Sequence, residues 1–117
     1  MTAEEYKAAC KMPDVLPRWA IEATKRSLDG SPALVSRLRE ILDGEPITKP
    51  DLHKGGKEVD HFHVQLADDE AQQIQDSLFD LEAGAVGSQG ESTPAASHFA
   101  SLVDIWQEYI EFNEKKT

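Results

Sequence analysis

The 117-residue sequence has one long stretch without positive charge, because no lysine or arginine occurs between Lys57 and Lys115. Residues 58–117 contain 13 Asp/Glu and 2 Lys/Arg, whereas residues 1–57 contain 9 Asp/Glu and 10 Lys/Arg. Binding to nucleic acid or to an anionic membrane requires cations that displace counterions from phosphates. The sequence therefore predicts neither partner. The acidic half indicates either a well-solvated surface or one that attracts a basic protein.

Cysteines, long apolar runs and a signal peptide are also scarce or missing. Cys10 is the single cysteine, so no internal disulfide is expected. No apolar run approaches the roughly 18 residues of a membrane-spanning helix. The N-terminal segment MTAEEYKAAC lacks the basic start and the apolar stretch of a signal peptide. We expect a cytoplasmic protein.

Motifs of catalysis and phosphate binding are absent as well. There is no G-x-S-x-G sequence, and the glycines at 84, 87 and 90 follow a predicted helix rather than a strand and have no lysine nearby. The many carboxylates of the second half are predicted on exposed helix faces, where they stay ionised. The sequence favours a protein that is not an enzyme and that needs no cofactor.

Caps and prolines mark the expected helices. Thr2 and Glu5 have the spacing of a capping box, Pro17 and Pro32 suit first helical positions, and Thr93 precedes Pro94. Together with the apolar periodicity, these signals predict helices at about 3–11, 17–28, 32–43, 69–83 (capped by Asp68) and 94–114. The length suits a single domain, 1–117, with a near-neutral helical half, 1–57, and a strongly acidic strand-helix-loop-helix half, 58–117.

The apolar period changes from 3.6 to 2 within residues 59–66, which predicts a half-buried strand. Phe62, Val64 and Leu66 would face the core. A lone strand needs a partner for its backbone groups, and the candidates are 45–49, 84–92, or the same strand of a second subunit in a homodimer. The predicted fold class is α+β, mainly helical, with four or five helices and a small two- to three-stranded sheet.

His61 and His63 share one face of this strand, at a spacing that suits two imidazole ligands of one metal ion. A zinc site needs three or four ligands, and Asp60 points to the opposite face of a regular strand. An ordinary polar face explains the pair with fewer requirements. A metal site at His61 and His63 is therefore the lesser hypothesis.

Acidic residues form a stripe on each of the last two predicted helices: Asp69, Asp76 and Asp80, then Asp104, Glu108 and Glu111. Ile105, Tyr109 and Phe112 lie beside the second stripe as candidate apolar anchors, unless they pack on the first helix. The main prediction is a small, non-enzymatic, inhibitor- or immunity-like domain whose acidic surface docks on a basic protein. The alternatives are a metal-binding module or enzyme using His61 and His63, and a housekeeping homodimer without a dedicated ligand.

Overall fold

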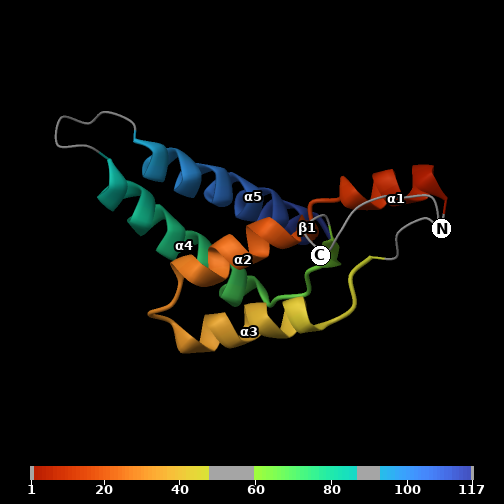
Figure 1. Ribbon diagram of the computed structural model, residues 1–117, viewed down its shortest axis with the longest axis horizontal. Helices are drawn as coiled ribbons and strands as arrows, with labels where there is room; N and C mark the ends of the chain where they lie inside the picture. Colours follow the sequence, from red (N-terminus) through yellow and green to blue (C-terminus); the bar gives the residue numbers. More distant parts are fainter. Residues whose placement is uncertain (1, 48–59, 87–92, 117) are drawn as a thin grey trace. The chain divides into compact units, whose positions relative to one another are not determined.

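A computed structural model describes residues 2–47, 60–86 and 93–116 (Figure 1). The helices are α1 (Ala3–Cys10), α2 (Arg18–Ser27), α3 (Pro32–Asp43), α4 (Asp68–Ala85) and α5 (Pro94–Lys116), and the strands are β1 (Val15–Pro17) and β2 (His61–His63). This is the predicted mainly helical α+β fold, with five helices and a two-stranded antiparallel sheet in the described ranges. None of these helices is long and apolar enough to cross a membrane.

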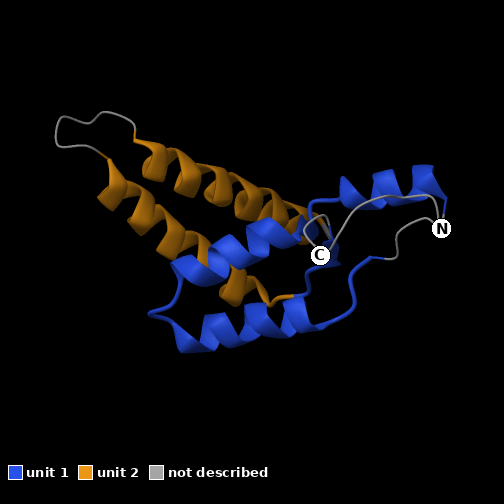
Figure 2. Ribbon diagram, in the orientation of Figure 1, with its two compact units in different colours: residues 1–65 blue, residues 66–117 orange. Residues whose placement is uncertain are grey.

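The contacts divide the chain into two compact units, Met1–Gln65 and Leu66–Thr117 (Figure 2). Unit 1 holds α1, α2, α3 and the sheet, and unit 2 holds α4 and α5. The strand that the sequence analysis grouped with the acidic half therefore belongs to unit 1, because its partner strand lies there. The single domain over 1–117 stays a prediction.

The partner of β2 is β1, with Leu16 opposite Phe62 in an antiparallel register. This segment was not among the three candidates that the sequence suggested for the paired strand. The segment 45–49 does contribute one contact, because the Ile47 N–H donates to the His61 carbonyl at 2.8 Å. Residues 48, 49 and 87–92 of the candidate segments lie outside the described residues.

The outer edge of β2 already makes hydrogen bonds within unit 1. The His61 carbonyl accepts from Ile47, and the Gln65 carbonyl accepts from Arg37 of α3 at 3.4 Å. On the other strand, Pro17 has no N–H to donate, a common way to protect a sheet edge. A homodimer through the 59–66 edge stays a prediction, and it would have to open these contacts.

Unit 1 buries the apolar face of the sheet together with α2 and α3. Its most deeply buried apolar side chains, at most 1% exposed, are Leu16, Ala20, Ile21, Leu38 and Phe62. Phe62, Val64 and Leu66 are buried as predicted, whereas His63 and Gln65 are exposed. The alternation of the sequence thus identified the buried face of this segment correctly.

Helix α1 begins at the predicted Thr2 cap, whose Oγ1 accepts a hydrogen bond from the Glu5 N–H at 3.1 Å. Ser31 precedes α3 as predicted, but its side chain makes no capping hydrogen bond. Pro17 ends β1 and is the N-cap of α2 rather than its first residue. The capping signals therefore located these three helices correctly. The observed first and last residues of the helices differ from the predicted ones by at most about one position.

Helices α4 and α5 pack against each other along their length as an antiparallel pair (Figure 1). At the junction, Thr93 Oγ1 accepts from the Ala96 N–H at 3.0 Å and donates to the Ala85 carbonyl at 2.6 Å. The predicted cap Asp68 is instead the first residue of α4, and Ala67 is the N-cap. The Ala67 N–H donates to Glu70 Oε1 at 3.0 Å, so half of a capping box is formed.

The buried side of this pair contains Ile74, Leu78, Leu102, Trp106 and Tyr109, each at most 1% exposed. The Tyr109 ring meets Trp106 edge to face, with centroids 5.5 Å apart. Its hydroxyl accepts from the Leu66 N–H at 2.9 Å and donates to the Leu66 carbonyl at 3.2 Å. Tyr109 therefore satisfies buried backbone groups at the start of unit 2.

Candidate protein-binding surface

All six acidic residues predicted for partner binding are exposed in unit 2. Asp69, Asp76 and Asp80 follow one side of α4, and Asp104, Glu108 and Glu111 follow one side of α5. No lysine or arginine precedes Lys115 in this unit, so no cation on its helices neutralises the carboxylates before the last turns of α5. We call these six residues the acidic surface.

A chain of hydrogen bonds joins the two stripes. The Gln75 amide, which is buried, donates to Gln107 Oε1 on α5. On α4, Gln72 Nε2 donates to Gln75 Oε1 at 3.3 Å and to Asp76 Oδ1 at 2.9 Å. On α5, Gln107 Nε2 donates to Glu111 Oε1 at 3.0 Å. Asp76 and Glu111 therefore lie at the two ends of one network that crosses between the helices.

The other four residues of the acidic surface lie within one helical turn of this network, because residues three or four apart on a helix are neighbours. They are Asp69 and Asp80 on α4, and Asp104 and Glu108 on α5. The network thus connects one residue of each predicted stripe, Asp76 and Glu111, and every other residue of the two stripes has a helical neighbour that leads back to it.

An exposed aromatic side chain, Phe79, lies one helical turn after this network on α4. It follows Gln75 by four residues and Asp76 by three, so its ring is the neighbour of both on α4. Its side chain is 48% exposed, which is unusual for a phenylalanine in a folded helix pair. The sequence analysis did not single it out, although it falls outside the apolar arc of Ala71, Ile74 and Leu78.

The predicted apolar anchors of α5 have different environments. Ile105 and Phe112 are half-buried on the two sides of Glu108 along the helix. Tyr109 is 1% exposed, and its hydroxyl is bonded to Leu66. Tyr109 is therefore buried within unit 2 and is not exposed as a surface anchor would be. Ile105 and Phe112 remain predicted apolar anchors beside the acidic residues of α5.

The two histidines of β2 have structural neighbours in unit 1. His63 Nε2 lies 2.8 Å from Oδ2 of the buried Asp14, and Gln65 Nε2 lies 3.4 Å from His63 Nδ1. The His61 ring meets Tyr6 edge to face, with centroids 6.3 Å apart. Within the described ranges, no group of three or more His, Cys, Asp or Glu side chains could hold a metal ion. The metal site stays a prediction.

Replacing His63 by alanine is expected to lower the free energy of unfolding by about 1–2 kcal/mol, because the buried Asp14 carboxylate loses a close hydrogen bond. Urea unfolding followed by circular dichroism measures the change. His98→Ala is the control, since His98 is exposed at the start of α5. Equal losses in the two variants would show that the Asp14–His63 contact has no stabilising effect.

The fold alters the titration of Tyr6, whose side chain is buried in unit 1. Burial raises the pKa of Tyr6 to about 12, and the neighbouring Cys10 and Asp60 add to the shift. Because the folded-state pKa exceeds the ordinary value of 10.0, the neutral phenol stabilises the fold below pH 10. This contribution is lost as the pH rises from 10 towards 12.

Tyr6→Phe should therefore make stability less sensitive to alkali. By about pH 11, the wild-type protein should have lost about 1 kcal/mol more unfolding free energy than the variant, relative to about pH 8. Urea unfolding of both proteins at each pH gives the difference. Parallel pH profiles would contradict the assignment of this titration to Tyr6.

No protein-family model matches this chain, and no curated protein or solved structure is significantly similar to it.

Proposed function

We propose that this protein is a small non-enzymatic binding domain, inhibitor- or immunity-like in its action, whose acidic surface docks on a basic protein. The observation that supports this function is the hydrogen-bonded glutamine network. It links Asp76 of α4 to Glu111 of α5, and the exposed Phe79 lies three residues after Asp76. A cytoplasmic location is part of the same proposal.

Charge and apolar contact have different roles in such a complex. The clustered carboxylates attract a cationic surface over a distance, which raises the association rate and orients the partner. Exposed ion pairs each contribute little to affinity, at about 0–1 kcal/mol. Most of the lasting affinity in protein interfaces comes from a few buried aromatic or arginine side chains. Phe79 is the side chain of the acidic surface that suits this role.

The partner that fits this surface has a cavity for a phenyl ring, surrounded by lysine or arginine side chains. By helical spacing, the carboxylates next to Phe79 on α4 are Asp76 and Glu82, three residues before it and three after it. Across the network, Asp104 and Glu111 of α5 lie within a turn of Gln107. The partner's cations would therefore lie on both sides of the cavity.

Affinity capture from lysate of the native host tests the proposal. The immobilised protein is compared at about 50 mM and about 500 mM salt, because screening at high salt weakens exposed charge attraction. A variant with Asp76→Asn, Asp80→Asn and Glu111→Gln neutralises three residues of the acidic surface. We expect a basic protein to be retained by the wild type at low salt, lost at high salt, and not retained by this variant.

The matched control carries Glu4→Gln, Asp43→Asn and Glu45→Gln, which change the net charge equally but lie exposed in unit 1. It should capture the same protein as the wild type. Equal loss in both triple variants would mean that net charge alone governs capture. Retention by both would remove the acidic surface from the interaction.

One observation favours the metal-binding alternative. A carboxylate on one imidazole nitrogen, as in the Asp14–His63 pair, is the arrangement that orients zinc-ligating histidines in other proteins. A module of this kind would bind zinc stoichiometrically and would lose it in His61→Ala and His63→Ala. Metal analysis after dialysis against zinc checks this, and the partner capture described above would be unaffected by either variant.

A further inference from the structure

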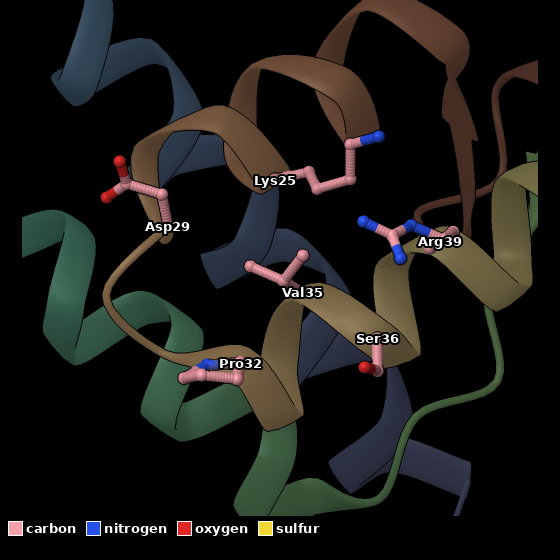
Figure 3. Close-up of a pocket in the computed structure, with 6 residues that line it drawn as sticks. All are labelled: Lys25, Asp29, Pro32, Val35, Ser36 and Arg39. Atoms are coloured by element: carbon pink, nitrogen blue, oxygen red, sulfur yellow. The ribbon is translucent and has the colours of Figure 1, made fainter.

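A surface depression of about 320 Å³ lies where α2 ends and α3 begins, within unit 1 (Figure 3). The residues around it are Lys25, Asp29, Pro32, Val35, Ser36 and Arg39. This volume is at the lower end of the range for small-molecule sites in proteins. It suits a small ligand that consists of one charged group and a compact organic part.

Two cations converge on this depression. Lys25, from α2, and Arg39, from α3, line the same end of it, with the Arg39 guanidinium directed into the depression and the Lys25 side chain extending toward the Arg39 side (Figure 3). Neither group makes an ion pair within the part of the chain that the structure describes, whereas Arg18 pairs with Asp60 and Arg37 pairs with Glu40. Two like charges at the same end of a depression repel, and an anion bound beside both would replace this repulsion by attraction.

The one carboxylate at the depression does not neutralise this pair. Asp29 lies at the opposite end, and its side chain points away from Lys25 and Arg39 (Figure 3). Between these ends, Val35 and Pro32 provide apolar surface. The depression thus has a cationic end and an apolar part.

We propose that this depression is a binding site for a small phosphate monoester, with the phosphoryl group between Lys25 and Arg39 and the organic part on Val35 and Pro32. A tetrahedral dianion matches two cations. The planar guanidinium of Arg39 can donate two parallel hydrogen bonds to phosphoryl oxygens, and the Lys25 ammonium acts as a compact charge beside it. This site is separate from the acidic surface and independent of the function proposed for it.

Titration of the ¹⁵N-labelled protein with inorganic phosphate and with phenyl phosphate, followed by NMR, tests the site. A pH of about 8 keeps the monoester a dianion, because its second pKa is about 6. Low salt, about 50 mM, preserves the attraction despite the net charge of −10 on the chain. We expect saturable shifts at the end of α2 and along α3, with tighter binding of phenyl phosphate than of inorganic phosphate.

Lys25→Met and Arg39→Gln should each raise the dissociation constant about tenfold or more, because each removes a charge-assisted contact. The matched control is Arg26→Gln, which removes an exposed cation of α2 that does not line the depression. Shifts that do not saturate, or an equal loss in Arg26→Gln, would overturn the site. Equal affinity for phosphate and phenyl phosphate would overturn the assignment of the organic part to Val35 and Pro32.

Discussion

Phe79→Ala is expected to weaken binding of the basic partner by about 30-fold or more, a loss of about 2 kcal/mol. The phenyl ring is 48% exposed in the free protein, and docking would bury it against the partner. Truncation to alanine removes this apolar contact and leaves the partner's cavity empty. The change should appear mainly as faster dissociation, because the charges that govern the association rate are untouched.

The same substitution should change the free energy of unfolding by less than about 1 kcal/mol, as is usual for exposed positions away from the core. Met12→Ala is the matched control, because Met12 is an apolar side chain of unit 1 with a similar exposure of 42%. It should leave partner affinity unchanged. Wild-type affinity in Phe79→Ala, measured by surface plasmon resonance with the captured partner, would remove Phe79 as an anchor.

Trp106→Ala is expected to lower the free energy of unfolding by about 3–5 kcal/mol. Trp106 is 0% exposed and is the largest of the fully buried side chains. Alanine would leave a void beside Tyr109, whose ring now meets the indole edge to face. Since a domain of this size has only about 5–15 kcal/mol of net stability, the loss is a large part of the total.

The second tryptophan provides the control for this prediction. Trp19 of α2 is 50% exposed, so Trp19→Ala should cost less than about 1 kcal/mol. Urea unfolding followed by circular dichroism is the measurement, because either substitution alters the fluorescence signal itself. A loss in Trp19→Ala as large as that in Trp106→Ala would contradict the burial on which both expectations depend.

The helices could be predicted from the sequence because their signals are local. Thr2 and Thr93 make the capping hydrogen bonds that their spacing indicated, and Pro32 begins α3. The strand β1 could not be predicted in this way, because Val15–Pro17 is too short to show alternation. Only its pairing with β2, which lies more than forty residues further along the chain, makes it a strand.

The residues of the acidic surface could be predicted from the sequence. The hydrogen-bonded contact between its two stripes could not. Helical periodicity gave the two stripes, because residues three or four apart share a face. The alignment of α4 with α5, which brings Gln75 to Gln107, depends on tertiary packing and has no local signal. The role of Tyr109 was missed for a similar reason, since its hydrogen bonds reach back to Leu66.

The most direct test of the account is to map where the captured partner binds by NMR on the ¹⁵N-labelled protein. We expect the largest shifts on complex formation within 72–83 of α4 and 100–112 of α5, around Phe79 and the glutamine network. Unit 1 residues such as Asp43 and Glu45 should change little. Large shifts confined to unit 1, with α4 and α5 unaffected, would contradict the proposal that the acidic surface binds the partner.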